Sequence, residues 1–347
     1  LGVAAILLSI STYAQDNPLW MRYCAISPDG TTIAFTYKGD IYTVPSTGGR
    51  ASQITTNPAH DTKPIWSPDG KKIAFASDRM GSMDIFEVNK EGGIPKRLTT
   101  HSGNETPVAY KDAGHILFLA NIMPTAEDAQ FPSGQFQQVY EVNTEGGRPI
   151  LFSSMPMEDI SINHTGNTLL YHDKKGYEDP WRKHHTSSIT RDIWLCSLNG
   201  NRTFRKQTAF NGEDRTPVWA SDDKSFYYLS EEKGSFNIFK RDIDGNTSKQ
   251  ITNHTKHPVR FLSAASNGTL CYGYDGEIYT VKEGAIPQKV QISIVTDKND
   301  KDLIRQIKRS GATEISLSPD AKEIAFVLRG DVYVTSTEYS TTKQITN

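Results

Sequence analysis

Short hydrophobic runs alternate with polar turns along this chain, and the same arrangement returns over most of its length. After the turn Ser67-Pro68-Asp69-Gly70, Ile73 and Phe75 fall on one face of an extended backbone and the residues between them on the other, which predicts a β-strand. Two further runs follow, Asp84-Ile85-Phe86-Glu87-Val88 and, after a Gly-Gly hairpin signal, Lys96-Arg97-Leu98-Thr99. Together with the residues before the turn, one unit is predicted to form four short antiparallel strands.

The turn itself has a physical signature. Pro fixes the backbone at its second position, Asp suits the third, and Gly accepts the left-handed conformation that follows. The same turn opens a unit near the start of the chain, as Ser27-Pro28-Asp29-Gly30, and near its end, as Ser318-Pro319-Asp320.

The later strands of the unit recur as well. The third strand is predicted at Asp40-Ile41-Tyr42, Asp84-Ile85-Phe86, Gln138-Val139-Tyr140, Asp192-Ile193-Trp194, Asn237-Ile238-Phe239, Glu277-Ile278-Tyr279 and Asp331-Val332-Tyr333. The last strand is predicted at Gln53-Ile54-Thr55, Arg97-Leu98-Thr99, Lys206-Gln207-Thr208, Gln250-Ile251-Thr252 and Gln344-Ile345-Thr346. A four-stranded repeat of roughly 40–45 residues indicates an all-β fold, a β-propeller. Each blade covers both of its faces only by stacking between two others.

The spacing of the units suggests how they are grouped. Six units occupy residues 17–294, residues 295–311 are dense in charge and lack strand alternation, and a seventh unit occupies residues 312–347. We expect a six-bladed propeller, a charged linker and the first blade of a second, truncated propeller. One seven-bladed ring is the alternative.

The first residues differ from the repeat. An apolar run ends in small and polar residues by residue 14, which predicts part of a signal peptide over residues 1–14, too short to span a bilayer as a permanent helix. We therefore expect export to the periplasm or the outside of the cell. The composition, 36% hydrophobic and 10% aromatic, is that of a soluble β protein, and the net charge of −2 argues against a nucleic-acid partner.

Two units carry long insertions between the second and third strands, and in an antiparallel meander both leave the same face of adjacent blades. The insertion of unit three, residues 120–136, has two acids and no Lys or Arg. The insertion of unit four, residues 174–191, is basic and aromatic, and would suit a peptide carboxylate or an acidic domain surface. A surface loop that only packs on a neighbouring domain is the alternative. The candidate contact residues are Tyr177, Trp181, Arg182, Lys183, His184, His185 and Arg191.

Other candidate chemistry finds less support in the sequence. Adjacent histidines point apart in a strand, so His184 and His185 predict no metal site, and no cofactor is expected. Glu231-Glu232 is interpreted as a solvated turn rather than an amine-binding pair. No Gly-x-Ser-x-Gly elbow and no nucleophile–base spacing is present. Three cysteines, Cys24, Cys196 and Cys271, lie far apart and are interpreted as small buried hydrophobes without a role that the sequence reveals.

The repeat resembles the propellers of the Tol-system periplasmic protein, of prolyl-oligopeptidase-type enzymes and of tricorn protease. Two stretches, PLWMRYCAISPDGTTIAFTYKGDIYTVPSTGGRASQIT (residues 18–55) and KGYEDPWRKHHTSSITRDIW (residues 175–194), look like the N-terminal region of bacterial tricorn protease homologues. The resemblance covers essentially the whole chain after the predicted signal, and the six-bladed ring, linker and restart match that family's order.

The resemblance implies an exported serine peptidase whose catalytic residues lie beyond Asn347. The chain would then be its non-catalytic N-terminal propeller, which frames substrate access and docks the protease domains. Implied partners are a peptide or unfolded-protein substrate and the protein's own C-terminal domains; homo-oligomer formation and peptide specificity stay open. We expect no membrane span after signal removal. A Tol-type binding propeller and a prolyl-oligopeptidase-type enzyme are the alternatives.

Overall fold

The computed structural model describes residues 18–122, 136–176, 179, 181, 182, 187–295 and 308–346. In these residues the regular secondary structure is β-strand, with no helix. It follows that no helix in the described part of the chain is long and apolar enough to cross a membrane. The predicted signal peptide and residues 296–307 of the predicted linker lie outside the described residues.

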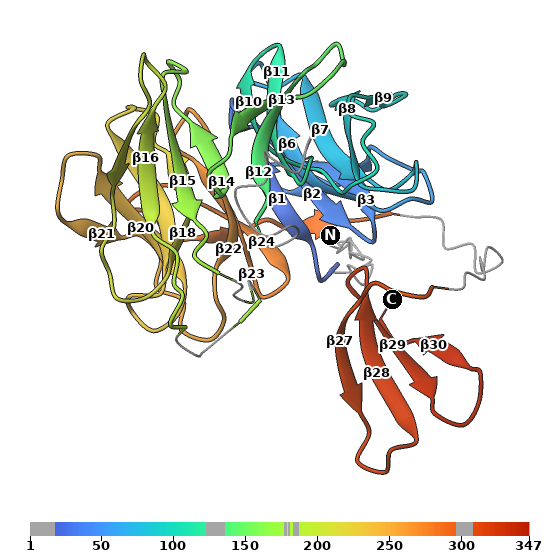
Figure 1. The fold of residues 1–347 in the computed structure, drawn as a ribbon. Helices are drawn as coiled ribbons and strands as arrows, with labels where there is room; N and C mark the ends of the chain where they lie inside the picture. The colour runs from blue at the N-terminus through green and yellow to red at the C-terminus, as the bar shows by residue number, and fades with distance from the viewer. Residues whose placement is uncertain are drawn as a thin grey trace, which may run out of the picture.

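Six four-stranded antiparallel sheets follow one another along the chain, each in the order of the sequence (Figure 1). The first three blades are β1 (Arg22–Ile26), β2 (Thr32–Tyr37), β3 (Asp40–Pro45) and β5 (Ser52–Gln53); β6 (Asp61–Trp66), β7 (Lys72–Ser77), β8 (Asp84–Asn89) and β9 (Lys96–Arg97); and β10 (Thr106–Asp112), β11 (His115–Ala120), β12 (Gln138–Asn143) and β13 (Ile150–Ser153).

The next three blades repeat the pattern. They are β14 (Met157–Ile162), β15 (Thr168–Asp173), β16 (Ile193–Ser197) and β17 (Thr203–Lys206); β18 (Asp214–Trp219), β19 (Ser225–Ser230), β20 (Asn237–Asp242) and β21 (Ser248–Gln250); and β22 (Arg260–Ala264), β23 (Leu270–Tyr274), β24 (Glu277–Val281) and β25 (Gln288–Lys289). The two insertions lie between β11 and β12 and between β15 and β16, as predicted.

The ring closes with six blades. The first strands of the blades contact one another in the order β1, β6, β10, β14, β18 and β22, and β22 contacts β1 again. A short parallel pair, β26 (Ile292–Ser293) with β4 (Gly49–Arg50), ties the end of the last blade to the first. The all-β, six-bladed prediction is therefore confirmed, and the seven-bladed alternative is wrong.

The hydrophobic core is divided among the seams between blades. Each cluster of buried residues in the described chain combines side chains of two neighbouring blades. In β2, Ile33 and Phe35 belong to the seam with the sixth blade, whereas Ala34 between them belongs to the seam with the second. Because successive strand residues face opposite sides, each sheet needs a neighbour on both faces to bury its apolar surface.

The repeated Thr of the fourth-strand motif has a structural role that differs from the prediction. The fourth strands end before it, and its hydroxyl instead accepts a hydrogen bond from the third strand, for example Ile41 N to Thr55 Oγ1 at 2.9 Å and Ile85 N to Thr99 Oγ1 at 2.9 Å. Thr208, Thr252 and Thr346 repeat the contact. The hydroxyl thus accepts a hydrogen bond from a third-strand N–H group, which a backbone carbonyl would accept if the fourth strand were longer.

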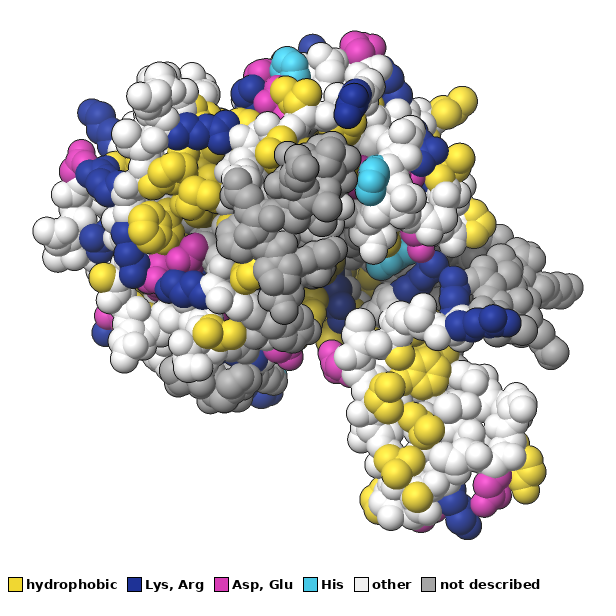
Figure 2. Space-filling view, in the orientation of Figure 1, with side chains coloured by type: hydrophobic (Ala, Val, Ile, Leu, Met, Phe, Trp, Pro, Cys, Tyr) yellow, Lys and Arg dark blue, Asp and Glu magenta, His cyan; other side chains and the backbone are white. Residues whose placement is uncertain are grey.

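A seventh sheet stands outside the ring. It consists of β27 (Ala312–Leu317), β28 (Glu323–Leu328), β29 (Asp331–Ser336) and β30 (Thr342–Gln344), shown in red in Figure 1. No described residue from 308 to 346 is buried, and Ile315, Leu317 and Ile345 are among the exposed hydrophobic residues. Figure 2 shows hydrophobic side chains gathered on the visible face of this sheet. The sheet has the blade topology without the two neighbours that cover a blade of the ring.

Candidate functional site at the mouth of the ring

The first strands of the blades, which surround the ring axis, carry backbone irregularities. In each of them the register with the second strand shifts, and in five blades a non-glycine residue there has a positive φ between 48° and 57°. A β-bulge bends the strand and re-aims its side chains. These bulge residues are Tyr23, Lys63, Asp159, Thr216 and Phe261.

The bulge residues of different blades contact one another. The rings of Tyr23 and Phe261 lie 4.8 Å apart between centroids, and Lys63 Nζ lies 5.7 Å from the Tyr23 ring. Thr216 Oγ1 donates a hydrogen bond to Asp159 Oδ2 at 2.6 Å. Partial burial lowers the pKa of Lys63 and raises that of Tyr23.

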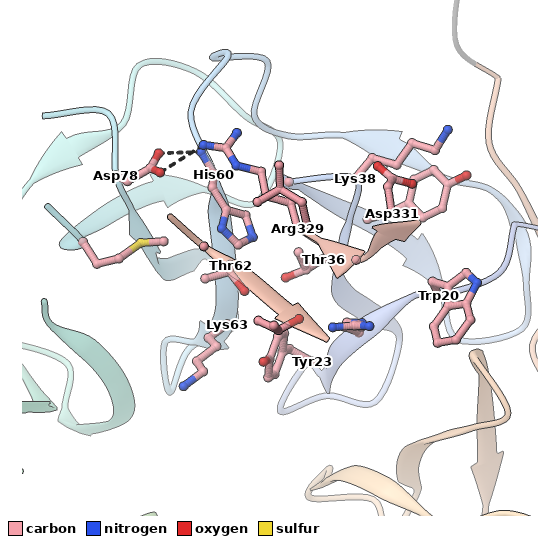
Figure 3. Close-up of a pocket in the computed structure, with 18 of the residues that line it drawn as sticks. Trp20, Tyr23, Thr36, Lys38, His60, Thr62, Lys63, Asp78, Arg329 and Asp331 are labelled. Atoms are coloured by element: carbon pink, nitrogen blue, oxygen red, sulfur yellow. Dashed lines mark hydrogen bonds and ion pairs between the residues drawn. The ribbon is translucent and has the colours of Figure 1, made fainter. Parts of the chain in front are cut away.

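A cavity of about 800 Å³ lies between this part of the ring and the seventh sheet, and we call it the mouth cavity (Figure 3). Its volume is within the range of small-molecule and peptide sites. The ring contributes residues that include Trp20, Arg22, Tyr23, His60, Lys63 and Trp181. The other side consists of residues before and within β27, the turn between β28 and β29, and Thr346. An ion pair spans the two sides, with Arg329 Nη2 at 3.1 Å from Asp78 Oδ2.

The lining of the mouth cavity is rich in positive charge. Its described basic residues are Arg22, Lys38, Lys63, Lys308, Arg309 and Arg329, and its described acids are Asp78, Glu314 and Asp331. Asp78 is bound to Arg329, and Asp331 accepts a hydrogen bond from Thr346. The cavity therefore favours an anionic group, such as a peptide carboxylate.

Trp181, from the insertion of blade four, reaches the mouth cavity and contacts the opposite side of the ring. Arg22 and Arg260 place their guanidinium carbons 4.9 and 5.0 Å from its ring centre, and Phe261 meets its edge with a centroid distance of 5.9 Å. Arg260 Nη2 also donates to the Trp181 carbonyl at 2.9 Å. The insertion thus crosses from blade four to blades one and six. Trp181 therefore anchors the insertion on blades one and six.

Arg182 and Arg191 hold the base of the insertion in a buried ion network. Arg182 binds Glu213 at 2.9 Å and Glu231 at 2.7 Å, and its side chain has no exposed surface. Arg191 Nη1 binds the second oxygen of Glu213 at 2.9 Å. Burial alone would lower the pKa of Arg182, but the hydrogen bonds to Glu231 and Glu213 raise it above its usual value. Arginine forms two directed bonds at once and therefore suits such a bridge.

These contacts correct two interpretations of the sequence. Arg182 and Arg191, which the sequence suggested as contacts for a peptide or a domain surface, are buried structural residues, and Glu231 is bound to Arg182 rather than solvated in a turn. Sequence reasoning missed Glu213, because two of its three arginine partners, Arg182 and Arg191, come from an insertion more than twenty residues away. It also missed Arg22 and Arg260, which lie in ordinary strands; the shift of register that aims them has no sequence signal.

The other predicted contact residues, Tyr177, Lys183, His184 and His185, lie outside the described residues, as do residues 123–135 of the insertion in blade three. Across the described ranges, no group of three or more His, Cys, Asp or Glu side chains is arranged to hold a metal ion.

The structure is that of a six-bladed propeller with a basic cavity at one end of the ring. Comparison with known proteins shows the family to which it belongs. A family model described as the tricorn protease N-terminal beta propeller domain matches residues 18–285, and the chain belongs to this family. Similar proteins include tricorn protease homolog 1 of Streptomyces coelicolor, 25% identical over 80% of this chain, and the tricorn protease of Thermoplasma acidophilum, 24% identical over 92%.

The chain spans only about a quarter of these relatives, 25% of the first protein and 29% of the second. Among solved structures, the tricorn protease matches with a TM-score of 0.67 and 21% identity, over 94% of this chain and 31% of that one. Puromycin hydrolase matches with a TM-score of 0.51 and 12% identity, over 97% of this chain and 54% of that one. Both likenesses show the propeller fold.

Proposed function

We propose that this chain is the non-catalytic N-terminal propeller of an exported, tricorn-like serine peptidase, and that its mouth frames the access of peptides to the protease domains. The mouth cavity carries the proposal, because it combines a volume suited to a peptide end with an excess of basic side chains. The names of the relatives, tricorn protease and its homologues, support peptidase activity in the complete protein.

The geometry of the mouth supports a role in positioning peptides. At the cavity, the Arg22 guanidinium lies over the Trp181 ring, so that a carboxylate can bind the guanidinium beside an aromatic surface. Guanidinium–carboxylate hydrogen bonds are charge-assisted and directional. Arg182, the next residue in the chain, is fixed by its ion pairs and thereby helps to hold Trp181 at the cavity.

The non-catalytic part of the proposal is supported by the hydrogen bonds of the histidines. In the parts of the chain that the structure describes, His172 binds Glu158 and the Thr216 amide, His164 binds Asp223, and His254 binds the Tyr272 hydroxyl. Among the described residues, none of these three histidines is hydrogen-bonded to a serine or cysteine side chain, the pairing that a nucleophile and its base require. The proposal assigns the catalytic serine to the protease domains of the complete protein.

The function can be tested in the complete protein by replacing Arg22 with Gln and measuring kcat/KM for matched peptides. We expect kcat/KM for a peptide with a free C-terminal carboxylate to fall roughly tenfold, as for the loss of a charged hydrogen bond. The amidated peptide should change much less, and the difference should shrink at high salt.

Arg205→Gln serves as the matched control, because Arg205 of the outer strand β17 is half exposed and pairs with Asp244 in the turn after β20. Equal losses for the two peptides, or equal effects of the two substitutions, would exclude a carboxylate-binding mouth. Serine-inhibitor-sensitive proteolysis by residues 1–347 alone would contradict the non-catalytic role.

A further inference from the structure

Two of the three cysteines meet at the seam that closes the ring. Cys24 lies in β1 of the first blade and Cys271 in β23 of the last, and these two strands contact each other. Both side chains belong to one hydrophobic cluster, with exposed fractions of 4% and 0%. The two cysteines are far apart in the sequence, which argued against a disulfide, but the closure of the ring brings them close together in space.

The backbone contacts at the seam bring the two thiols together. Cys24 Sγ donates to the Phe261 carbonyl of β22 at 3.5 Å. Two residues further along β22, Ser263 is the register partner of Cys271, and its hydroxyl accepts a hydrogen bond from Ile26 of β1 at 3.0 Å. Burial is the larger cause of the raised pKa of the Cys271 thiol, and the neighbouring Cys24 thiol contributes to it. The third cysteine, Cys196, lies in a separate cluster between blades three and four.

We propose that Cys24 and Cys271 form a modification site, an inter-blade disulfide that joins the first and last blades covalently. The reaction is thiol–disulfide exchange with an external disulfide. One protein thiolate attacks that disulfide and expels a thiol, and the second protein thiolate then displaces the other thiol. One protein disulfide forms, one external disulfide is reduced to two thiols, and the two cysteines lose their protons.

The environment of the thiols determines when the bond forms. Both are buried in the closed ring, and burial raises the pKa of Cys271 well above its usual value, which disfavours the reactive thiolate. The exchange therefore takes place during folding, as the last blade docks on the first. Once formed, the bond encloses almost the whole ring in one covalent loop, and it restricts the unfolded chain strongly.

The proposal can be tested on the intact protein, unfolded and then refolded either with a mixture of reduced and oxidised glutathione or with reductant alone. After alkylation and digestion, mass spectrometry should show the peptide of Cys24 linked to that of Cys271, with Cys196 alkylated. The melting temperature of the oxidised protein should exceed that of the reduced protein by several degrees. The comparison needs no substitution, so a folding defect of a variant cannot obscure it.

Variants distinguish this pair from the third cysteine. Cys24→Ala or Cys271→Ala should abolish both the cross-link and the effect of oxidation on the melting temperature, whereas Cys196→Ala should retain both. Free Cys24 and Cys271 after oxidative refolding would overturn the proposal. So would a cross-link to Cys196, or a lower melting temperature of the oxidised form.

Discussion

At the scale of single residues, the repeat is preserved by small polar contacts as well as by hydrophobic side chains. The Ser hydroxyl of the turn binds the Asp two residues later and the backbone at the start of the next strand, as Ser67 does with Asp69 and Lys72. Gly70 completes the turn with a φ of 67°. After five of the seven fourth strands, a Thr hydroxyl binds the backbone of the third strand, as Thr55, Thr99, Thr208, Thr252 and Thr346 do. Both devices are visible in the sequence as recurring residue types.

The Thr contact predicts a clear effect on stability. Thr99→Val keeps the shape of the side chain but leaves the Ile85 amide, which is fully buried, without its acceptor. The free energy of unfolding should fall by about 1–3 kcal/mol, the cost of an unsatisfied buried donor. Urea unfolding measures it.

Thr99→Ser is the control for this substitution, because it retains the hydroxyl and removes only a methyl group. The serine variant should be the more stable of the two. A valine variant as stable as the native protein would show that the hydroxyl does not contribute.

At the scale of elements, the insertion between β15 and β16 is held in place by buried ion pairs and by the packing of an aromatic side chain. Arg182 binds Glu213 and Glu231 of blade five, and Trp181 packs against Arg22 and Arg260 of blades one and six. An element that the sequence presents as a loop therefore bridges four blades. The composition of the insertion suggested contact with a partner. In the structure, most of its described charged side chains form ion pairs with residues of the ring.

Arg182→Ala should consequently destabilise the protein, contrary to the expectation for a solvated charge. Removing one side of a buried ion network leaves carboxylates desolvated, which costs about 3–5 kcal/mol. Denaturant unfolding of Arg182→Ala and Arg205→Ala compares a fully buried pair with an exposed one, and the second should lose about 0–1 kcal/mol. Equal losses would contradict the structural role of Arg182.

At the scale of the whole molecule, carboxyl groups face each other across several seams of the ring. Asp40 of blade one lies near Asp61 of blade two, and Glu105 before blade three lies near Asp84 of blade two. Burial raises the pKa of Asp40, Glu105 and Asp214 to about 7. Each therefore binds a proton more tightly in the folded protein than in the unfolded chain.

These seams predict that stability falls as the pH rises. Between the unfolded pKa, about 4, and the folded pKa, the folded protein binds more protons than the unfolded chain, so the free energy of unfolding decreases as the pH rises from about 5 to about 7. Glu105→Gln should flatten this dependence, measured by urea unfolding across the pH range. Glu283→Gln, at an exposed lysine-paired carboxylate whose pKa is lowered, should leave it unchanged in this window. An equally steep dependence in both variants would contradict the assignment.

The ring and the seventh sheet should also differ in resistance to proteolysis. Every seam of the ring contains a buried cluster, whereas none of the described residues 308–346 is buried. A single blade without neighbours cannot offset the entropy cost of ordering its chain. In a fragment comprising residues 1–347, limited proteolysis followed by mass spectrometry should show cleavage within residues 308–346 before cleavage of β1 to β25. Equal protection of the two parts would show that the seventh sheet is packed stably against the mouth.

The sequence by itself determined the repeated unit, its turns, the alternation of its strands and the number of units, because these depend on contacts among residues close together in the chain. Tertiary structure decided what depends on residues brought together from distant blades. It determined that the ring closes with six blades, that Arg182 and Arg191 are buried, and that Cys24 and Cys271 meet across the closing seam. The physical reason is that side chains become buried and paired mainly at the seams between blades. The composition of two blades does not reveal which of their side chains will face each other across a seam.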